Sequence, residues 1–219
     1  MKNLKIDKRL QAVASLVDKC DLVADIGTDH GYLPIYLIQN GIVKKAIASD
    51  VAVGPLSQAK DNIIKYHLED KIKPVLSDGL DNIDDIPDCL IFAGMGANLI
   101  IDILSRRKHD YDCLILQPNL NTYLLREYIV SQNYKIIDEK VEIVHNKYYD
   151  IMKVVKGKQQ LSELEIKYGP INLVKKETNF KLKLESLLNN YEKILTDFKG
   201  NDQERDKLLN EVNEIKKIL

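Results

Sequence analysis

Three acidic residues follow short apolar runs of the sequence, and their spacing could serve a ligand that carries a nucleoside. Asp25 lies near the end of the first run, and Asp50 ends the second run 25 residues later. At the carboxyl end of a strand, the first carboxylate can meet a cationic amino group, and the second stands where ribose hydroxyls are usually held. Asp78 begins an Asp-Gly turn with Gly79 after the third run. That turn would place a carboxylate near an adenine amino group, although most Asp-Gly turns bind no ligand.

The loop after the first acid has the composition of a ligand-binding turn. Gly27 and Gly31 flank Thr-Asp-His, and glycine lets the backbone turn sharply and approach a ligand closely. Pro34 fits the first turn of a following helix, where its missing N–H is not needed. The dinucleotide pattern Gly-x-Gly-x-x-Gly is absent, so a nicotinamide cofactor has little support. A polar turn that only closes a buried strand is the alternative for this loop taken alone.

The elements that must position these residues alternate between helix-like and strand-like runs. A helix is predicted over 7–17, and helices are expected to end near 39, 66, 107 and 131. Strands are predicted over 22–25, 46–50, 72–76, 89–93 and 113–117, and 134–156 should form an antiparallel hairpin around 145–147. Pro74 predicts an edge position for the third strand. The pattern predicts an α/β fold: a mostly parallel sheet with helices on both faces and one reversed strand.

The composition narrows the class of protein. Hydrophobic residues make up 45% and charged residues 30% of the 219 residues, which describes a soluble globular chain. No apolar run approaches the roughly 20 residues that would span a bilayer, and the N-terminus has no apolar signal core, so we expect a cytoplasmic protein. The cysteines, Cys20, Cys89 and Cys113, form no Cys-x-x-Cys pair, and no metal site is expected.

The C-terminal part of the chain is predicted to be a separate helical unit. A short helix over 161–168 ends at Gly169-Pro170, and two longer helices face each other across 200–202. Their apolar residues recur in steps of four and three, which predicts an antiparallel coiled coil with the seam Phe180, Leu184, Leu187, Tyr191, Ile194 and Phe198 against Leu208, Val212, Ile215 and Leu219. We therefore divide the chain into 1–158 and 159–219. Oligomerisation, rigidity and contact with RNA are the open roles for the second unit.

Five short motifs, taken together, resemble the bacterial TrmK family: Asp-Ile-Gly-Thr-Asp-His-Gly-Tyr-Leu-Pro at 25–34, Ser-Asp-Val at 49–51, Ser-Asp-Gly-Leu at 77–80, Ala-Gly-Met-Gly at 93–96 and Gln-Pro-Asn at 117–119. The resemblance spans nearly the whole chain, including the helical tail. It implies a Rossmann-like class I methyltransferase domain followed by a helical coiled-coil domain. It also implies S-adenosyl-L-methionine as cofactor, tRNA as partner, and methylation of N1 of adenine 22 in the D-arm.

The resemblance also implies roles for individual residues. The methionine part of the cofactor is expected beside Asp25, Gly27, Asp29 and Gly31, the ribose beside Asp50, and the adenine beside Asp78 and Gly79. The whole expected cofactor site is Asp25, Gly27, Asp29, His30, Gly31, Asp50, Asp78, Gly79, Ala93, Gly94 and Met95, and the expected catalytic positions are Asp29, Gly94 and Asn119. Two positions depart from the pattern, because Asp29 stands where many methyltransferases have a second glycine and Ala97 stands where the family's loop continues with glycine. Asp29 must then adopt ordinary dihedrals, and Ala97 needs a negative φ.

The RNA contacts must come from local patches, because the net charge of −1 gives no global attraction to nucleic acid. The basic leading end, which includes Lys2, and two further sites supply the candidates: Lys5, Lys8, Arg9, Arg106, Arg107, Lys175 and Lys176. A monomer without membrane or metal partners is expected. Two other classes stay open. A small-molecule methyltransferase would need a lid over its substrate, and the sequence has no long insertion that could form one. A non-catalytic RNA-binding or scaffold protein would tolerate the loss of the cofactor-binding acids, but Asp25, Asp50 and Asp78 are all present.

Overall fold

The protein is described by a computed structural model that covers residues 3–219, so Lys2 of the basic leading end lies outside the described residues. Within this range the strands form one seven-stranded sheet of order β3-β2-β1-β4-β5-β7-β6. The strands are β1 (Cys20–Ile26), β2 (Val43–Asp50), β3 (Ile72–Leu76), β4 (Cys89–Met95), β5 (Cys113–Pro118), β6 (Tyr134–Val144) and β7 (Lys147–Lys156). The first five strands pair in parallel, and β7 is antiparallel to both β5 and β6.

This topology confirms the predicted sheet, including its reversed strand. Pro74 lies in β3 at the sheet edge, where a missing N–H removes no ladder hydrogen bond on the open side. The hairpin of β6 and β7 turns at His145 and Asn146, whose φ values of 49° and 60° match a tight turn with two left-handed residues. The mostly parallel sheet, with its order reversing between β1 and β4, is the Rossmann-like arrangement of methyltransferases.

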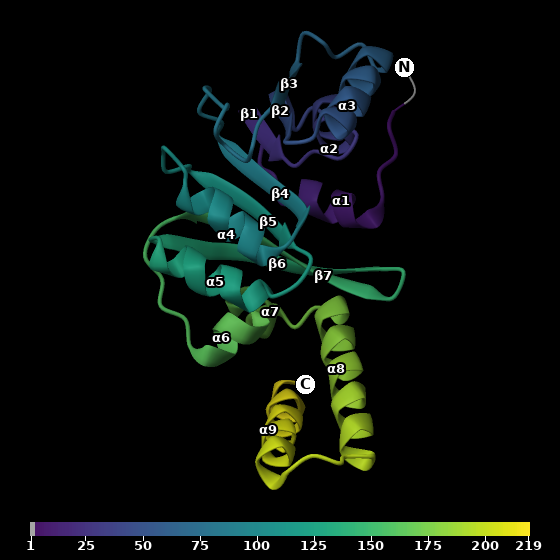
Figure 1. The fold of residues 1–219 in the computed structure, drawn as a ribbon, viewed down its shortest axis with the longest axis vertical. Helices are drawn as coiled ribbons and strands as arrows, with labels where there is room; N and C mark the ends of the chain where they lie inside the picture. The colour runs from purple at the N-terminus through teal and green to yellow at the C-terminus, as the bar shows by residue number, and fades with distance from the viewer. Residues whose placement is uncertain (1–2) are drawn as a thin grey trace.

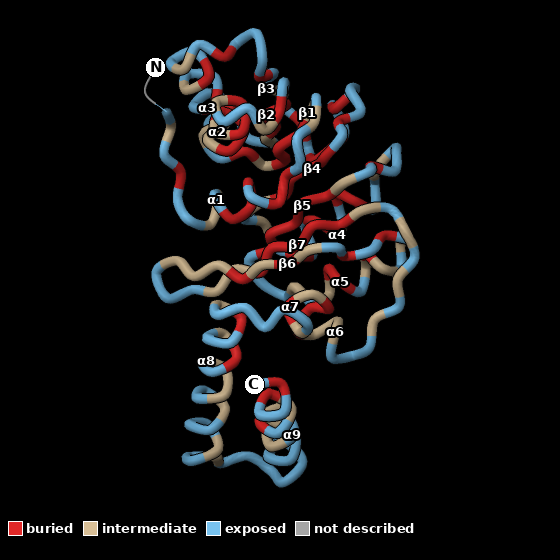
Figure 2. The backbone as a smooth tube through the Cα atoms, turned by 180° about the vertical axis from the view of Figure 1, so that it is seen from behind, coloured by how far each residue is buried: buried red, intermediate tan, exposed pale blue. Residues whose placement is uncertain are grey.

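Helices cover both faces of the sheet (Figure 1). On one face α1 (Lys8–Ala14), α2 (Tyr32–Gln39) and α3 (Val53–Lys65) pack over a core that includes Val13, Ile35 and Ile63. On the other face α4 (Ala97–Ser105) and α5 (Thr122–Ser131) pack over a second core that includes Ile103 and Leu125. The tube in Figure 2 is buried along the central strands and becomes exposed in the loops at their ends. The loops that follow the strands therefore sit on a rigid support.

The C-terminal segment has one docked part and one projecting part. Short helices α6 (Glu163–Tyr168) and α7 (Pro170–Lys175) pack on α5 and β6, and α7 was not expected from the sequence. The longer helices α8 (Thr178–Thr196) and α9 (Asp202–Ile218) form a hairpin that projects away from the sheet (Figure 1). The predicted pair of antiparallel helices is therefore present.

The apolar seam of this hairpin is tight only near the sheet. Phe180, Leu184 and Ile215 are buried with Val141 of β6 and Tyr168 of α6. At the far end Ile194 is 49% exposed, and at the C-terminus Leu219 is 41% exposed while Ile218 is buried, so the seam prediction was wrong at Ile194 and Leu219. At each of these positions a neighbour takes the inward place, half-buried Leu195 and buried Ile218, because the apolar face of a helix with about 3.6 residues per turn drifts from a strict heptad spacing.

A buried ion pair fastens α6 and α7 to the sheet. Arg126 of α5 donates from Nε to Glu139 of β6 at 2.8 Å, and both side chains are 1% exposed. The Arg126 guanidinium also donates to the Ile166 and Lys167 carbonyls, and the other Glu139 oxygen accepts from the Ile171 N–H. Burial raises the pKa of Glu139, and the charge of Arg126 opposes that shift.

None of the helices described within 3–219 has the length and apolar character that a membrane span requires.

Candidate functional site

A cavity of about 310 Å³ opens at the carboxyl end of β1, next to β4. The strand order reverses at this place, which is where open α/β sheets bind their ligands. The lining comes from the end of β1, the loop after it, α1 and the end of β4, and it includes Arg9, Asp25, Gly27, Asp29, His30, Tyr32 and Ala93. The structure thus brings five of the expected cofactor residues into one cavity.

Asp25 is the buried acid of this cavity. Its side chain accepts a hydrogen bond from the Thr28 hydroxyl at 2.7 Å, and the residue is 5% exposed. Burial raises the pKa of Asp25 from 3.8 to about 6, against the lowering effects of the Thr28 hydrogen bond and the Arg9 charge. A carboxylate that is this shielded from solvent favours a cationic partner, because the partner would replace the missing hydration.

The loop between β1 and α2 is shaped by its two glycines. Gly27 has φ +74°, and a Cβ there would lie 2.1 Å from Cε of Met95, so the loop and the end of β4 pack closely. Gly31 has φ +68° and precedes α2. Asp29 does not have a positive φ, as expected, whereas its neighbour His30 takes the left-handed conformation with φ 60°.

The side chains of this loop pair with one another. His30 Nε2 lies 3.1 Å from Oδ1 of Asp29, and its ring stacks on Tyr32 with centroids 5.2 Å apart. The His30 carbonyl accepts from Nδ2 of Asn62 at 2.9 Å, which ties the loop to α3. The Asp29 side chain is 83% exposed and therefore open to a ligand on its outer side.

Asp50 and Asp78 stand on the next two loops along the same sheet edge. Asp50 accepts from the Ala52 N–H at 2.8 Å through Oδ1, and the Asp50 carbonyl accepts from the Ser77 N–H at 2.9 Å. The Gly27 and Thr28 N–H groups both donate to the Ser49 carbonyl. These backbone bonds join the three loops, although Asp50, Asp78 and Gly79 are not among the residues that line the cavity.

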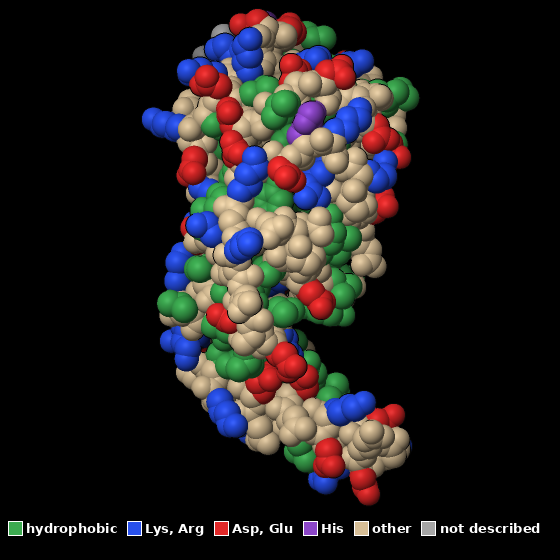
Figure 3. All heavy atoms as spheres, turned by 90° about the vertical axis from the view of Figure 1, so that its left-hand side faces the viewer, with side chains coloured by type: hydrophobic (Ala, Val, Ile, Leu, Met, Phe, Trp, Pro, Cys, Tyr) green, Lys and Arg blue, Asp and Glu red, His purple; other side chains and the backbone are tan. Residues whose placement is uncertain are grey.

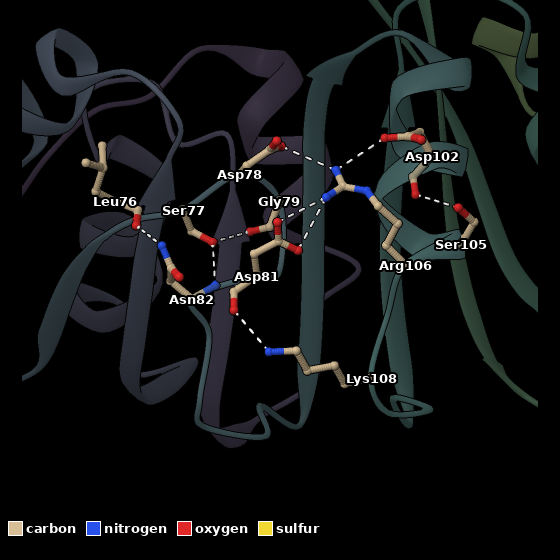
Figure 4. Close-up of polar contacts among 10 residues, drawn as sticks. All are labelled: Leu76, Ser77, Asp78, Gly79, Asp81, Asn82, Asp102, Ser105, Arg106 and Lys108. Carbon is tan, nitrogen blue, oxygen red and sulfur yellow. Dashed lines mark hydrogen bonds and ion pairs between the residues drawn. The ribbon is translucent and has the colours of Figure 1, made fainter.

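The loop that carries Asp78 is clamped to α4 by one arginine (Figure 4). Arg106 pairs with Asp78 at 3.3 Å, with Asp81 at 3.1 Å and with Asp102 at 3.2 Å. Gly79 has φ +56°, and a Cβ there would lie 2.6 Å from Cγ2 of Ile103 in α4. The conformation around the adenine candidate Asp78 thus depends on α4.

The end of β4 approaches the loop after β5. Gly94 has φ +89°, and a Cβ there would lie 3.2 Å from Nη1 of Arg9. Asn119 donates from Nδ2 to the Gly94 carbonyl at 2.6 Å, and its backbone N–H donates to the Met95 carbonyl at 2.7 Å. Ala97 is the first residue of α4 and has no positive φ, so its methyl group is tolerated as the sequence required.

Sequence reasoning missed one contact of the cavity. Arg9 was expected to meet RNA phosphate, but it lines the cavity, and its Nη1 donates to Oε1 of Gln117 at 2.6 Å. Gln117 is fully buried at the end of β5, and the Arg9 guanidinium lies 5.9 Å from the Tyr149 ring. No local pattern links residues 108 positions apart, but a glutamine inside the apolar run 113–117 was a signal that something polar faces it.

The remaining RNA-binding candidates differ in whether their side chains already have partners within the protein. Lys5 and Lys8 are exposed near the start of α1. Intramolecular partners hold the others: Arg106 in its acidic cluster, Arg107 with Asp110, Lys175 with Asp138 and Lys176 with the Ile218 carbonyl. On the face shown in Figure 3, basic and acidic side chains are interspersed, and the surface is hollowed where the helical hairpin leaves the body. Within 3–219, no group of three His, Cys, Asp or Glu side chains is placed to hold a metal ion.

Similarity to known proteins agrees with this geometry. Residues 6–152 match the family described as a methyltransferase domain. The tRNA (adenine(22)-N(1))-methyltransferase of Bacillus subtilis is 37% identical over 161 residues, which are 72% of this chain and 68% of that protein.

Two solved structures extend the similarity over the helical tail. The Bacillus subtilis m1A22 tRNA methyltransferase TrmK has a TM-score of 0.86 at 30% identity and covers 99% of both chains. M. capricolum TrmK, in complex with the cofactor product S-adenosyl-homocysteine, has a TM-score of 0.86 at 33% identity, and the match covers 97% of this chain and 96% of that one. By its sheet, its acid-bearing loops and these similarities, the chain belongs to the methyltransferase-domain family and, within it, to the TrmK tRNA (adenine(22)-N1)-methyltransferases.

Proposed function

We propose that this protein transfers a methyl group from S-adenosyl-L-methionine to N1 of adenine 22 in the D-arm of tRNA. The observation that carries the proposal is the pair of opposite charges in one cavity at the switch point of the sheet. Asp25 and Arg9 both line this cavity, and the methionine end of the cofactor carries one ammonium and one carboxylate group. The residues therefore fit the cofactor at its most polar end.

Each part of the cofactor has a matching group in the protein. Asp25 would bind the ammonium group and Arg9 the carboxylate, because each is a buried or half-buried charge that a counter-charge would stabilise. Asp50 would accept from the ribose hydroxyls through the oxygen that the Ala52 N–H leaves free. Asp78 would accept from the adenine amino group while Arg106 holds its loop against α4.

The protein's part in the chemistry is alignment and charge stabilisation. The bound cofactor supplies a sulfonium methyl group that a lone pair can attack in line. Adenine N1 is a neutral ring nitrogen with such a lone pair, so no strong base is needed before attack. Holding the reacting atoms about 3–3.5 Å apart can supply roughly 7–11 kcal/mol. Because N1 lies on the Watson–Crick edge, the base must be unpaired or flipped out of the helix.

Acceptor groups beside the exocyclic amine would stabilise the cation that forms on the methylated base. Asp29, with its carboxylate exposed beside the cavity, and the Gly94 carbonyl are the candidates. Asn119 donates to that carbonyl, which fixes its direction and leaves one lone pair for the base. Tyr32 stacks on His30 at the cavity wall and would limit the space open to the base.

The two parts of the chain would share the work. We propose residues 1–158 as the methyltransferase domain and residues 159–219 as a helical coiled-coil domain that contacts tRNA. Oppositely charged residues are nearly balanced in the tail, with 12 Lys or Arg against 11 Asp or Glu between 158 and 219, so shape rather than net charge would guide that contact. A monomer acting on cytoplasmic tRNA is the simplest working state.

The test is methyl transfer from labelled S-adenosyl-L-methionine to unmodified tRNA transcripts, followed by nuclease digestion and identification of the nucleoside by mass. We expect 1-methyladenosine from a transcript with adenine at position 22, and no incorporation when guanine replaces it. Label in another nucleoside, or incorporation that ignores the base at that position, would overturn the proposal.

A further inference from the structure

A second hollow, of about 270 Å³, lies beside the loop between β5 and α5. Its rim includes Asn119, whose amide reaches the Gly94 carbonyl, so it adjoins the proposed reactive centre. Its other walls are the first residues of α5, the end of the β6–β7 hairpin and α8, which contribute Tyr123, Asp150 and Lys183. The hollow therefore lies between the methyltransferase domain and the projecting hairpin, and no part of the proposed methyl transfer uses it.

Asp150, which lines the hollow, has one buried carboxylate oxygen without a donor among the described residues. Asp150 is 9% exposed, and its Oδ2 accepts from the Thr122 hydroxyl at 3.2 Å and pairs with Nζ of Lys183. Its Oδ1 is buried and has no hydrogen-bond partner within residues 3–219. Burial alone would raise the pKa of Asp150, but Lys183 and Arg126 hold it below its ordinary value. The free oxygen thus belongs to a carboxylate, and a buried carboxylate oxygen without a donor is unfavourable until a ligand N–H or O–H supplies one.

The rim offers an exposed apolar surface and the start of a helix. Leu120 is 73% exposed and Tyr123 is 47% exposed, and both line the hollow. Lys167 and Lys183 line the opposite side, where Lys167 pairs with Glu211 and Glu214 and Lys183 pairs with Asp150. The N-terminus of α5 has no side-chain cap from Asn121, and an uncapped helix start favours an anion. Aromatic face, N–H acceptor and anion site together match the base and phosphate of one nucleotide.

We propose that this hollow binds an unpaired nucleotide that flanks the target adenine in the RNA. Its base would stack on Tyr123 and Leu120 and donate to Oδ1 of Asp150, while its phosphate lies near the start of α5. Such a site would hold the strand open beside the adenine that must leave its helix, which adds to the binding of the RNA. The inference rests on the proposed function, because it takes tRNA as the substrate.

The protein-side test compares Tyr123→Ala and Leu120→Ser, singly and together, with the control Ile86→Ser. Ile86 is 61% exposed and lies before β4, at the opposite edge of the sheet, so the control removes an exposed apolar side chain elsewhere. We expect the double variant to raise the KM for tRNA about tenfold or more, the effect of losing one stacked base, with kcat changed by less than about twofold. Calorimetry should show an unchanged Kd for S-adenosyl-L-methionine in every variant.

The RNA-side test uses tRNA with a single abasic residue on the 5′ or the 3′ side of the target adenine. One of these substrates should raise the KM of the wild-type enzyme, and the same substrate should bring no further loss in Tyr123→Ala. If the losses add fully for both substrates, or if the double variant matches Ile86→Ser, the hollow does not bind a flanking nucleotide. A wild-type chain that methylates no tRNA would instead overturn the proposed function, and this inference with it.

The free oxygen of Asp150 can be tested separately. The flanking nucleotide is replaced by purine riboside, which keeps a stacking ring but lacks the exocyclic N–H donor. The wild-type enzyme should lose affinity for this substrate relative to adenosine, and Asp150→Asn should discriminate less between the two. Thermal unfolding checks that the variant is folded. Equal discrimination by a folded Asp150→Asn variant would remove this carboxylate from base recognition.

Discussion

The protonation of Asp25 should make the affinity for the cofactor depend on pH. In the unliganded protein burial raises the pKa of Asp25 to about 6, whereas a bound ammonium group would require the carboxylate form. The affinity for S-adenosyl-L-methionine should therefore be constant above about pH 7 and should fall by up to about tenfold per pH unit below 6. Calorimetric titration between pH 5 and 8 measures this slope.

The matched variant for that measurement is Asp25→Asn, which should bind the cofactor weakly and without this pH dependence. It should also stabilise the unliganded protein at neutral pH. Because the pKa rises from 3.8 to about 6 on folding, the folded state holds a proton that the unfolded state has lost, and stability falls as pH rises through this window. The gain from Asn should be roughly 1–3 kcal/mol at pH 7.5 and absent at pH 3. An equally steep affinity profile in Asp25→Asn would place the titrating group elsewhere.

Asp50 should bind ribose through a carboxylate that also braces its own loop. Asp50→Ala should weaken cofactor binding by roughly 1.5–3 kcal/mol, the value of hydrogen bonds to a charged group. Asp50→Asn is the control, because its side-chain oxygen can still accept from the Ala52 N–H. A loss in Asp50→Ala that Asn restores completely would mean that Asp50 only shapes the loop. Unchanged affinity in folded Asp50→Ala would remove the residue from the site.

Acids and glycines at strand ends could be read from the sequence because the strands are apolar runs and parallel strands end at one edge. Arg9 could not be placed in the same way, since its partner Gln117 comes close only when α1 packs beside β5. The same limit applies to Arg106, whose acidic partners belong to another loop as well as to its own helix. Contacts between side chains of distant segments depend on packing that no local pattern records.

At the scale of elements, the junction of β4 and α4 offers a matched pair of glycines, Gly94 near the end of β4 and Gly96 just before α4. Gly94 has φ +89°, and a Cβ there would lie 3.2 Å from Nη1 of Arg9, whereas a Cβ on Gly96 would meet nothing within 4 Å and its φ is −72°. Gly94→Ala should therefore lower kcat for tRNA methylation by at least about tenfold, because backbone strain of about 1–3 kcal/mol moves the loop that faces the target base. Gly96→Ala should keep nearly parental activity.

Both variants should remain folded, which circular dichroism and thermal unfolding can verify. If Gly94→Ala methylates tRNA at the parental rate, the loop does not line the reactive centre. A comparable loss in both variants would point to the flexibility of the whole loop, rather than to the left-handed conformation of Gly94.

Regular elements were predicted to within a few residues where periodicity was long, as in the five parallel strands. The helix α7 was missed because it begins at Pro170, within the Gly169-Pro170 pair that was interpreted only as the end of the preceding helix, and it is held by Glu139, which accepts from its Ile171 N–H. The predicted seam between α8 and α9 was wrong at Ile194 for a different reason. The heptad pattern places Ile194 inward, but Leu195 is the half-buried residue there, whereas Phe180 and Leu184 near the sheet are buried as expected.

At the scale of the molecule, the tail is attached to the sheet by polar contacts that differ along its length. Arg126 and Glu139 bind α6 and α7 from inside the core, and breaking such a buried pair typically costs about 3–5 kcal/mol. The pair of Asp150 and Lys183 joins β7 to α8 closer to the surface. Within the proposed second domain, α6 and α7 are therefore fastened to the sheet, and the projecting hairpin begins after α7.

This arrangement predicts different outcomes for two truncations. A chain that ends at Lys158 loses the carbonyls of 166 and 167 around Arg126 and the N–H groups around Glu139, so we expect it to unfold or aggregate. A chain that ends at Lys176 keeps these contacts and should fold, with Asp150 opened to water where α8 was. Its cofactor affinity should persist, because the proposed cofactor residues all precede α5.

For the chain that ends at Lys176, kcat/KM for tRNA should fall by at least about tenfold, or about 1.4 kcal/mol, since the remaining body with Lys5 and Lys8 holds RNA only weakly. Calorimetry and methylation assays on both chains measure these effects, and full activity of the chain that ends at Lys176 would leave the hairpin with no role in binding tRNA.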